Sequence, residues 1–514
     1  MADNNINNPT ELVIRFERVV RSNPLGRIIS LDASELSYKG LWEEANLIAE
    51  ELKIKLGPNK RHVSIEAHKA PTNLAVLIAC WLLNWSYTFV DLRQPVSRLQ
   101  QIIKASNTSV LISRDSNEKL ALSRQLAIKS LNRVNFCVTV DKERPYAFSL
   151  DTCYIMFTSG STGIPKGVPI TSTQVLRFTD WLKVEFRIQD SDILTTVNPW
   201  YFDNSVFDIY MSLLTGSSLV LVDIDEFQGS LEWIELLIKK KPTVWFSVPS
   251  LLILLQSVGA FKDEKFDCLR LIIFGGEAYP KQQLRQLLED QGSDTDFRSV
   301  YGPTETTCIC SVTEVNQKEL TSSASFVSLG KFPDFIHVGL HDTFILENGD
   351  FAGELILGGS NVTEGYVNEE DNLGKFALIP RGGGSLSRYY LSGDLVSYNP
   401  ELGSLCFLGR RDNQIKRFGV RIELEEIESR IERECGTPCV ADYDPARSPD
   451  LCVLFKVTNE VDNNRVMLAC NSILSSYMAP RAVFGISNLP LNANGKKDRK
   501  QARMILNDLV QVST

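Results

Sequence analysis

The sequence feature that most constrains the fold is a glycine-rich stretch that joins two regular segments. Residues 157–168 read FTSGSTGIPKGV. The apolar run Cys153–Phe157 before the stretch has the length of a strand, and Thr171–Val184 after it has the pattern of a helix. A glycine-rich turn between a strand and a helix is typical of phosphate-binding loops, so the sequence predicts an α/β layer with such a loop at its edge.

The composition of the loop supports phosphate binding. Three glycines let backbone amides approach a ligand, four residues carry hydroxyls, and Lys166 supplies a positive charge. The Walker pattern requires Ser or Thr after the lysine, but Gly167 follows Lys166, so the loop does not match it. The loop does not match the dinucleotide pattern G-x-G-x-x-G either. A flexible surface turn is the alternative, because glycine and serine favour turns for reasons unrelated to ligands.

Length and charge limit the class of protein. The chain has 514 residues, which is more than one compact hydrophobic core usually holds, so we expect at least two domains. Its hydrophobic content of 43% is enough to form their cores. The net charge of −9 disfavours nucleic-acid binding. The N-terminus lacks a secretory signal, and the apolar segment near Leu74–Leu83 is too short to cross a bilayer. We expect a soluble cytoplasmic protein with no membrane partner.

Cysteine and histidine give no signal of a metal centre. The eleven cysteines have no regular framework and are expected to be reduced thiols. The four histidines form neither a metal site nor a catalytic triad. His337 and His341 lie in an alternating segment that predicts a strand, so structural roles are expected for them.

The apolar runs predict α/β layers followed by a smaller domain. Strand-like runs alternate with helical stretches, and they are 63–66, 88–90, 110–112, 218–222, 244–247 and 271–274. After residue 411 the character changes, with a charged helix at 423–434 and a compact α+β remainder. The expected domains are therefore 1–411, large and α/β, and 412–514, small and α+β.

Four later motifs accompany the loop. They read YGPTET at 301–306, YLSGD at 390–394, GRRDNQIK at 409–416 and NGKKDR at 494–499. With the loop, and in this order, they resemble the AMP-forming adenylating superfamily of acyl-CoA synthetases, luciferases and nonribosomal peptide adenylation domains. The resemblance implies a mobile C-terminal domain with Asp412 as its hinge. The alternative for Asp412 is a residue that caps a turn.

The resemblance further implies ATP and Mg²⁺ as cofactors. The residues it assigns to ATP are Thr158, Ser159, Gly160, Ser161, Thr162, Gly163, Lys166, Tyr301, Thr304, Asp394, Arg410 and Lys496. The catalytic residues it assigns are Lys496, Glu305 and Thr304.

Each assigned position has an expected role. By the resemblance, Tyr301 lies against adenine, Thr304 contacts the α-phosphate, and Glu305 holds the metal ion. Asp394 accepts from the ribose hydroxyls with help from Arg410. Lys496 bridges the carboxylate of the acid and the α-phosphate in the transition state. The alternatives are a core tyrosine, a turn aspartate and a solvated lysine.

The segment 200–207, WYFDNSVF, indicates which acid is activated. It resembles the amino-acid branch of the superfamily, in which an aspartate at the position of Asp203 pairs with the α-ammonium group. The alternative is an aspartate that caps the helix beginning near Val206. The side-chain pocket is expected to be lined by Asn204, Phe207, Phe246, Ile272, Phe274, Val300, Cys308 and Ile309. Three phenylalanines leave room for a small substrate side chain.

Over its full length the chain is most similar to the stand-alone D-alanine:carrier protein ligases. Those ligases have a cysteine where this chain has Gly275, so the amino acid and its enantiomer stay open. The residues given after Lys496 are too few for a carrier domain, so we expect a separate phosphopantetheinylated carrier protein as the partner. An acyl- or aryl-CoA ligase is the alternative enzyme, against which Asp203 argues. A nucleotide-binding regulator without catalysis is the alternative outside enzymes.

Overall fold

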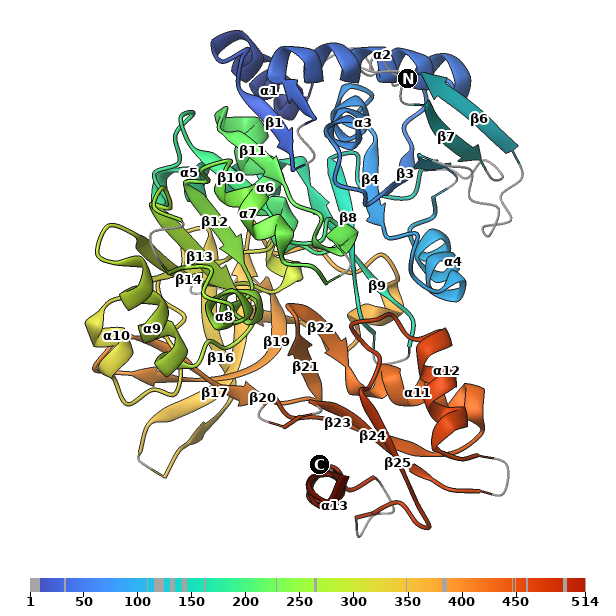
Figure 1. Ribbon diagram of the computed structural model, residues 1–514, viewed down its shortest axis with the longest axis vertical. Coiled ribbons are helices and arrows are strands. Elements are labelled where there is room, and N and C mark those ends of the chain that lie inside the picture. The colour runs from blue at the N-terminus through green and yellow to red at the C-terminus, as the bar shows by residue number, and fades with distance from the viewer. Residues whose placement is uncertain are drawn as a thin grey trace. The chain divides into compact units, whose positions relative to one another are not determined.

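The computed structural model places most of the chain in regular elements. It describes residues 10–31, 34–108, 110–114, 124–129, 135–140, 146–160, 163–227, 229–262, 266–347, 349–380, 386–445, 447–448, 450–458, 461–492 and 497–513. These residues form two compact units (Figure 1). The first unit comprises Met1–Asp91, Ile103–Phe157 and Gly167–Arg411, and the second comprises Leu92–Ile102, Thr158–Lys166 and Asp412–Thr514.

The contact units and the predicted domains share the junction between Arg411 and Asp412. The sequence assigned Leu92–Ile102 and Thr158–Lys166 to the large domain. In the structure these two short segments belong to the same unit as the C-terminal residues. The division into domains 1–411 and 412–514 stays a prediction.

An eight-stranded sheet, the first sheet, organises the larger unit. Its strands in spatial order are β15 (Ser311–Glu314), β14 (Asp296–Tyr301), β13 (Leu271–Gly275), β12 (Val244–Ser247), β10 (Ile193–Thr196), β11 (Ser218–Leu221), β1 (Arg27–Ser30) and β2 (Glu35–Ser37). The six inner strands are parallel, and β15 and β2 run antiparallel at the two edges. The apolar runs at 218–222, 244–247 and 271–274 become β11, β12 and β13, which confirms the predicted parallel strands.

A seven-stranded second sheet carries the glycine-rich loop at its edge. Its strands in order are β6 (Arg124–Lys129), β7 (Asn135–Val140), β5 (Val110–Ser113), β3 (His62–Glu66), β4 (Ser86–Val90), β8 (Thr152–Thr158) and β9 (Lys166–Thr171). Strand β9 lies between the loop and the predicted helix and was not foreseen. It contains Pro169, which an edge strand tolerates because its amide is not needed for pairing.

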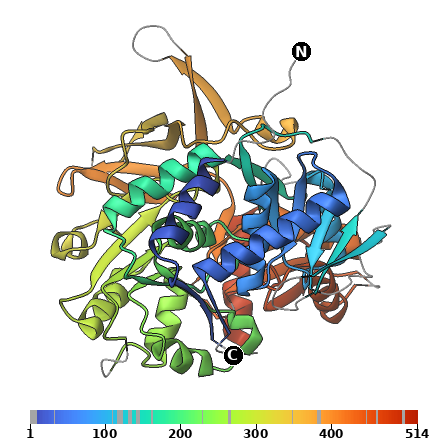
Figure 2. The ribbon, with the colours of Figure 1, turned by 90° about the horizontal axis from the view of Figure 1, so that it is seen from above.

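Five helices pack with the two sheets around one large core (Figure 2). They are α1 (Glu11–Ser22), α2 (Tyr38–Leu56), α3 (Pro71–Leu82), α5 (Ser172–Glu185) and α6 (Asn204–Thr215). Helix α5 confirms the predicted helix after the loop. It begins with a capping box, in which Thr171 Oγ1 accepts from Gln174 N at 3.2 Å and Gln174 Oε1 accepts from Thr171 N at 2.9 Å.

A second core covers the other face of the first sheet. It is built with α7 (Glu232–Ile238), α8 (Pro249–Ser257), α9 (Lys281–Gln291) and α10 (Gln317–Thr321). The described connections contain three short 3₁₀ helices, which are η1 (Ile224–Phe227), η2 (Thr304–Thr306) and η3 (Glu369–Asn372). Parallel strands thus have helices on both faces, as their unbroken apolar runs require.

An antiparallel third sheet completes the larger unit. Its strands are β16 (Ile336–Ile345), β17 (Phe351–Gly359), β18 (Phe376–Pro380), β19 (Leu386–Asn399) and β20 (Ser404–Arg410). Both His337 and His341 lie in β16, where a strand was expected. The register of β19 and β20 sets Asp394 opposite Arg410.

The second unit is α+β, as predicted for the C-terminal residues. It contains the hairpin β21 (Gln414–Arg417) and β22 (Val420–Glu423), the sheet β23 (Cys439–Tyr443), β24 (Leu451–Lys456) and β25 (Ala482–Ile486), and the helices α11 (Leu424–Cys435), α12 (Asn463–Ile473) and α13 (Arg499–Ser513). Helix α4 (Val96–Ala105) begins in this unit and ends in the first. The described part of the chain contains no helix with the length and apolar content needed to cross a membrane.

Candidate active site

The loop after β14 holds the centre of the predicted site. Tyr301 ends the strand, and Thr304 and Glu305 lie in η2. Gly302 between them has no space for a side chain, because a Cβ there would lie 2.2 Å from the carbonyl oxygen of Cys308. The chain therefore turns back tightly at the carboxyl end of a parallel strand, which is where α/β sheets bind ligands.

The residues predicted to bind the nucleoside lie together. The Tyr301 hydroxyl donates to Asp394 Oδ2 at 2.6 Å, and Arg410 Nη1 donates to Asp394 Oδ1 at 2.7 Å. Arg410 also donates to the carbonyl oxygen of Ser392 at 3.0 Å. Burial above all, and then the Asp394 charge, raise the pKa of Tyr301 well above its usual value, so the phenol stays a proton donor.

Asp203 does not cap the helix that follows it. Helix α6 begins at Asn204, and Asp203 occupies the N-cap position without a hydrogen bond from its side chain to the helix amides. Its Oδ2 instead accepts from the Thr304 hydroxyl at 2.5 Å. The structure therefore brings the predicted ammonium-binding and α-phosphate-binding residues into direct contact.

Glu305 is fully buried and is held by residues that the sequence analysis missed. Its Oε1 accepts from the Tyr366 hydroxyl at 2.5 Å, and its carbonyl oxygen accepts from Thr363 N at 2.8 Å. The Tyr366 ring packs edge-on against Phe376, with ring centroids 5.8 Å apart. A tyrosine in a polar connection carries no periodic signal, so only the three-dimensional structure pairs it with Glu305.

Glu354, on β17, is a second residue that was missed. Its Oε1 accepts from Gly393 N and its Oε2 from Arg411 Nη1, both at 2.9 Å. Arg411 also donates to Asp342 Oδ2 at 2.6 Å. One buried carboxylate thus holds both the turn that presents Asp394 and the last residue of the first unit.

The structure divides the predicted side-chain pocket between two cores. Those that share the core between the two large sheets are Phe207, Phe246, Val300, Cys308 and Ile309. Ile272 and Phe274 belong to the second core, on the opposite face of the first sheet. Strand alternation explains the split, because Phe246 pairs with Ile273 in the β12–β13 register and Ser247 pairs with Phe274.

Individual residues of the predicted pocket differ in their contacts and burial. Phe207 and Phe246 meet edge to face, with ring centroids 5.4 Å apart. Asn204 is half-buried, and its Nδ2 lies 3.6 Å from the position of a Cβ on Gly276. Burial chiefly, followed by the Asp203 charge, raises the pKa of the Cys308 thiol well above its usual value, which keeps this cysteine protonated.

Gly275 marks the departure from the D-alanine ligases. A Cβ at this position would lie 2.5 Å from both Cγ2 and the carbonyl oxygen of Val300. The backbone of β14 therefore fills the space in which the cysteine of those ligases would begin.

The described part of the glycine-rich loop is closely packed within the second unit. A Cβ on Gly160 would lie 2.1 Å from the carbonyl oxygen of Ile164, and Gly163 has a φ of +78°. Both glycines are thus required by the backbone. Ser161 and Thr162 lie outside the described residues.

Side chains of the same unit contact this loop. The Ser159 hydroxyl donates to the carbonyl oxygen of Arg421 at 2.7 Å, and Arg430 Nη2 donates to that of Gly163 at 3.1 Å. Thr158, which ends β8, and Lys166 are both buried. One predicted donor of the loop, the Ser159 hydroxyl, is thus engaged by the hairpin β21–β22.

The last two predicted positions lie in the second unit. Lys496 falls outside the described residues. Its neighbour Lys497 donates to Glu428 Oε2 and Glu432 Oε1, both at 2.8 Å. Asp412 Oδ1 accepts from Gln414 N at 3.3 Å, an aspartate turn that agrees with the capping alternative and leaves the hinge a prediction.

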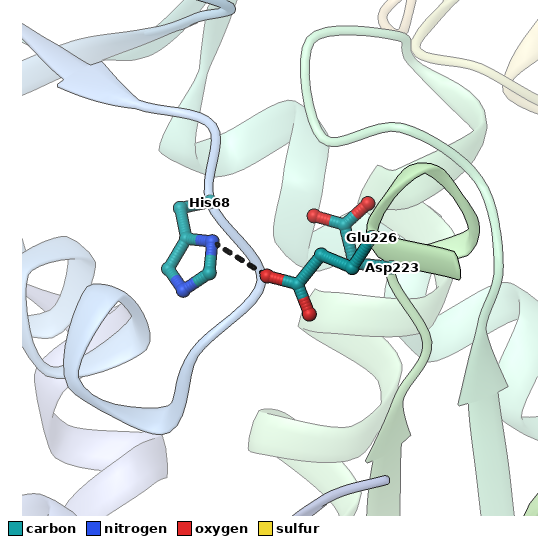
Figure 3. A group of neighbouring side chains, drawn as sticks. All are labelled: His68, Asp223 and Glu226. Atoms are coloured by element: carbon teal, nitrogen blue, oxygen red, sulfur yellow. Dashed lines mark ion pairs between the residues drawn. The ribbon is translucent and has the colours of Figure 1, made fainter. Parts of the chain in front are cut away.

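Among the described residues, one cluster of possible metal ligands consists of side chains outside the predicted site (Figure 3). His68, Asp223 and Glu226 each place a ligand atom within 4.8 Å of the others. Arg114 Nη1 lies 2.9 Å from His68 Nε2 and can only donate, so Nε2 accepts and the proton is on Nδ1. His68 Nδ1, which carries this proton, lies 3.5 Å from Glu226 Oε1, and the proton occupies the position a metal would need. The geometry fits a network of polar contacts among protein side chains.

A surface cavity of about 760 Å³ shares no residue with the predicted site. It lies beside α9 and the start of β14, and is lined mainly by polar and acidic side chains such as Glu289, Asp294 and Asp296. The cavity lies at the start of β14, whereas the predicted site follows the end of this strand.

Comparison with known proteins agrees with this geometry. The family model described as "AMP-binding enzyme" matches residues 16–367. The D-alanine--D-alanyl carrier protein ligase of Bacillus velezensis is 31% identical over 92% of this chain and 94% of its own length. Bacitracin synthase 1 of Bacillus licheniformis is 30% identical over 94% of this chain, which spans 9% of that much longer protein.

Solved structures show the same fold. The Vibrio cholerae adenylation domain AlmE, in complex with glycyl-adenosine-5'-phosphate, matches with a TM-score of 0.79 at 21% identity over 99% of each chain. The nonribosomal peptide synthetase protein PA1221, which contains adenylation and carrier domains, matches with a TM-score of 0.78 at 23% identity, over 97% of this chain and 84% of its own. By its sequence match, its fold and the residues gathered after β14, the chain belongs to the family of AMP-binding enzymes.

Proposed function

We propose that the chain activates a small amino acid with ATP and loads it onto a separate carrier protein. One observation carries the proposal. The loop after β14 presents Tyr301 to Asp394 at 2.6 Å and, three residues later, Thr304 to Asp203 at 2.5 Å. The two ends of one short turn thus contact a nucleoside-binding carboxylate, Asp394, and a carboxylate suited to an ammonium group, Asp203.

The first half-reaction forms an acyl phosphate bond. A carboxylate oxygen of the amino acid attacks the α-phosphorus of ATP, and pyrophosphate leaves with the electrons of the broken P–O bond. Asp203 binds the α-ammonium group, which aims the carboxylate, and Thr304 donates to the α-phosphate. Asp394 and Arg410 hold the ribose. Lys496 neutralises the charge that grows between the carboxylate and the α-phosphate.

Glu305 fits the expected magnesium site. It is fully buried and offers carboxylate oxygens, the ligand type that Mg²⁺ prefers together with substrate phosphates. The Tyr366 hydroxyl fixes the carboxylate without cancelling its charge. When bound, the ion would neutralise negative charge on the phosphates.

In the second half-reaction the phosphopantetheine thiol of the carrier attacks the aminoacyl carbonyl. A thioester forms, and AMP leaves with the electrons of the mixed anhydride bond. The relatives named D-alanine--D-alanyl carrier protein ligase support a separate carrier as the acceptor and a small amino acid as the substrate.

The test is ATP–pyrophosphate exchange with a panel of acids. The panel holds both enantiomers of alanine, glycine, other small amino acids, and the matching acids without the amino group. We expect exchange with one or a few amino acids and at least a hundredfold weaker exchange with the acids that lack the amine. Exchange supported equally by simple acids, or release of ADP instead of AMP, would overturn the proposal.

Asp203→Ala supplies the matched control, since it removes the ammonium acceptor. We expect this variant to lose its preference for amino acids over simple acids. Transfer of a radiolabelled amino acid to a phosphopantetheinylated carrier, and none to free coenzyme A, separates the proposed ligase from a CoA ligase.

A further inference from the structure

Thr304 has a single hydroxyl proton for two proposed acceptors. In the structure this hydroxyl donates to Asp203 Oδ2 at 2.5 Å. In the proposed reaction the same hydroxyl donates to the α-phosphate of ATP. A threonine hydroxyl carries one proton, so it cannot donate to both acceptors at once.

We propose that Thr304 couples the two substrates, because the α-ammonium group of the amino acid replaces the Thr304 hydroxyl at Asp203 and frees that hydroxyl for the α-phosphate. The inference rests on the proposed function and adds a specificity-determining role for Thr304.

Backbone hydrogen bonds hold the segments on both sides of this contact. Thr304 is buried in η2, where its carbonyl oxygen accepts from Thr307 N at 3.2 Å. The carbonyl oxygen of Asp203 accepts from Val206 N at 2.9 Å, at the start of α6. The proposed exchange is a rotation of the Thr304 side chain, for which neither of these backbone hydrogen bonds has to break.

The surroundings of Asp203 favour a donor to its carboxylate. Asp203 is half-buried, its side chain does not cap α6, and it lies beside the buried Cys308 and Tyr154, whose pKa values its charge helps to raise. A donor that replaces the Thr304 hydroxyl keeps this carboxylate hydrogen-bonded, whereas removal of the hydroxyl alone does not. The Thr304 hydroxyl is therefore released most readily when another donor takes its place.

An ammonium group is the donor that fits. It brings a positive charge and three N–H groups to the carboxylate, and a charged hydrogen bond of this kind is stronger than that of a neutral hydroxyl. An acid without an amino group offers no such donor and leaves Thr304 on Asp203. An amino acid would then raise the affinity for the nucleotide, and an acid without an amino group would not. This difference would add to the difference in affinity for the two acids themselves.

Coupling of this kind is reciprocal and measurable. Two linked ligands typically change the affinity of each other by about 5- to 150-fold. The experiment measures the dissociation constant of α,β-methylene ATP, which cannot release pyrophosphate, by calorimetry on the full chain. It is measured alone, with the amino acid that supports exchange, and with the same acid lacking its amino group. We expect at least a fivefold tightening with the amino acid and none with its analogue.

Three variants isolate the hydroxyl. Thr304→Ser keeps the hydroxyl proton and should keep the coupling. In Thr304→Val the dissociation constants of the nucleotide with and without the amino acid should differ by less than twofold. Thr306→Val is the matched control, because the Thr306 hydroxyl in the same 3₁₀ helix donates to the carbonyl oxygen of Pro303 at 2.9 Å. This control should keep the wild-type coupling.

The outcomes separate the inference from the proposed function. Exchange with an amino acid, without any effect of that amino acid on nucleotide affinity in the wild type, would overturn the coupling and leave the function intact. Coupling that persists in a folded Thr304→Val variant would do the same. A panel in which no amino acid supports exchange would overturn the function and the inference with it.

Discussion

Asp203, Glu305 and Asp394 each accept a hydrogen bond from a hydroxyl group of another residue. The donors are Thr304, Tyr366 and Tyr301, from the same region of the first unit. A hydroxyl offsets part of the cost of burying a carboxylate and leaves its negative charge in place. The predicted site thus keeps anionic groups ready for an ammonium group, a metal ion and the ribose hydroxyls.

Tyr366→Phe should weaken the response to magnesium. The change removes the donor to Glu305 Oε1 and little volume, and a hydrogen bond to a charged group is worth about 1.5–3 kcal/mol. We expect the Mg²⁺ concentration that half-saturates nucleotide binding to rise about tenfold or more, measured by calorimetry. Tyr398→Phe, at a half-exposed tyrosine of β19, is the control and should change nothing. An unchanged magnesium response in Tyr366→Phe would show that Glu305 needs no such partner.

His62 should make the fold sensitive to mild acid. Burial lowers the pKa of His62 to about 3, and the ring lies 2.9 Å from both Ser86 Oγ and Thr88 Oγ1. Below pH 6.5 the unfolded chain gains a proton that the folded chain refuses, so this residue lowers the free energy of unfolding as the pH falls toward 3, by about 1.4 kcal/mol per pH unit.

Urea unfolding between pH 7 and pH 5 tests this dependence. His62→Gln should be less stable at pH 7 and should lose less stability on acidification than the wild type. His341→Gln, at a half-exposed histidine, is the control and should keep the wild-type slope. Equal slopes in all three proteins would exclude His62 as the source.

At the scale of elements, the sequence predicts strands better than it predicts their faces. The run 271–274 is apolar throughout, so it predicts a buried parallel strand, and β13 confirms this prediction. The same run carries no alternation from which to decide which residues face the site. Phe246 and Phe274 consequently looked equivalent in the sequence, although β12 and β13 direct them into different cores.

Gly275→Ala should destabilise β13 against β14. The added Cβ would lie 2.5 Å from the carbonyl oxygen of Val300, and relief of such overpacking costs about 1–3 kcal/mol. We expect a lower free energy of unfolding by urea denaturation. Adding Val300→Ala should not restore stability, because the carbonyl oxygen stays in place. Full recovery in the double variant would instead attribute the conflict to the Val300 side chain.

At the scale of the whole molecule, the motif order predicts the family, and the change of composition near residue 411 predicts a junction. The family is confirmed by the match over residues 16–367, and the two compact units meet in sequence at Arg411 and Asp412. Contacts between distant segments were not predictable. Neither Tyr366 with Glu305 nor Glu354 with Gly393 follows a periodic pattern, because each pair joins residues more than thirty positions apart.

Lys496 and Lys497 should differ in which half-reaction they affect. Lys496→Ala removes the proposed charge in the adenylation transition state, a loss of about 3–4 kcal/mol or more, and should reduce ATP–pyrophosphate exchange by at least a hundredfold. Transfer from supplied aminoacyl-AMP to the carrier should stay largely intact.

Lys497→Ala is the matched control, since Lys497 pairs with Glu428 and Glu432 within the second unit. We expect it to lower thermal stability slightly and to spare both half-reactions. Normal exchange in Lys496→Ala would remove that lysine from the mechanism.

The carboxylate of Glu354 accepts hydrogen bonds from two separate parts of the first unit. One oxygen steadies the amide of Gly393, beside the aspartate expected to hold the ribose, and the other holds Arg411 at the end of the first unit. Loss of this single side chain would therefore remove the partner of the Gly393 amide and one partner of Arg411 at the same time.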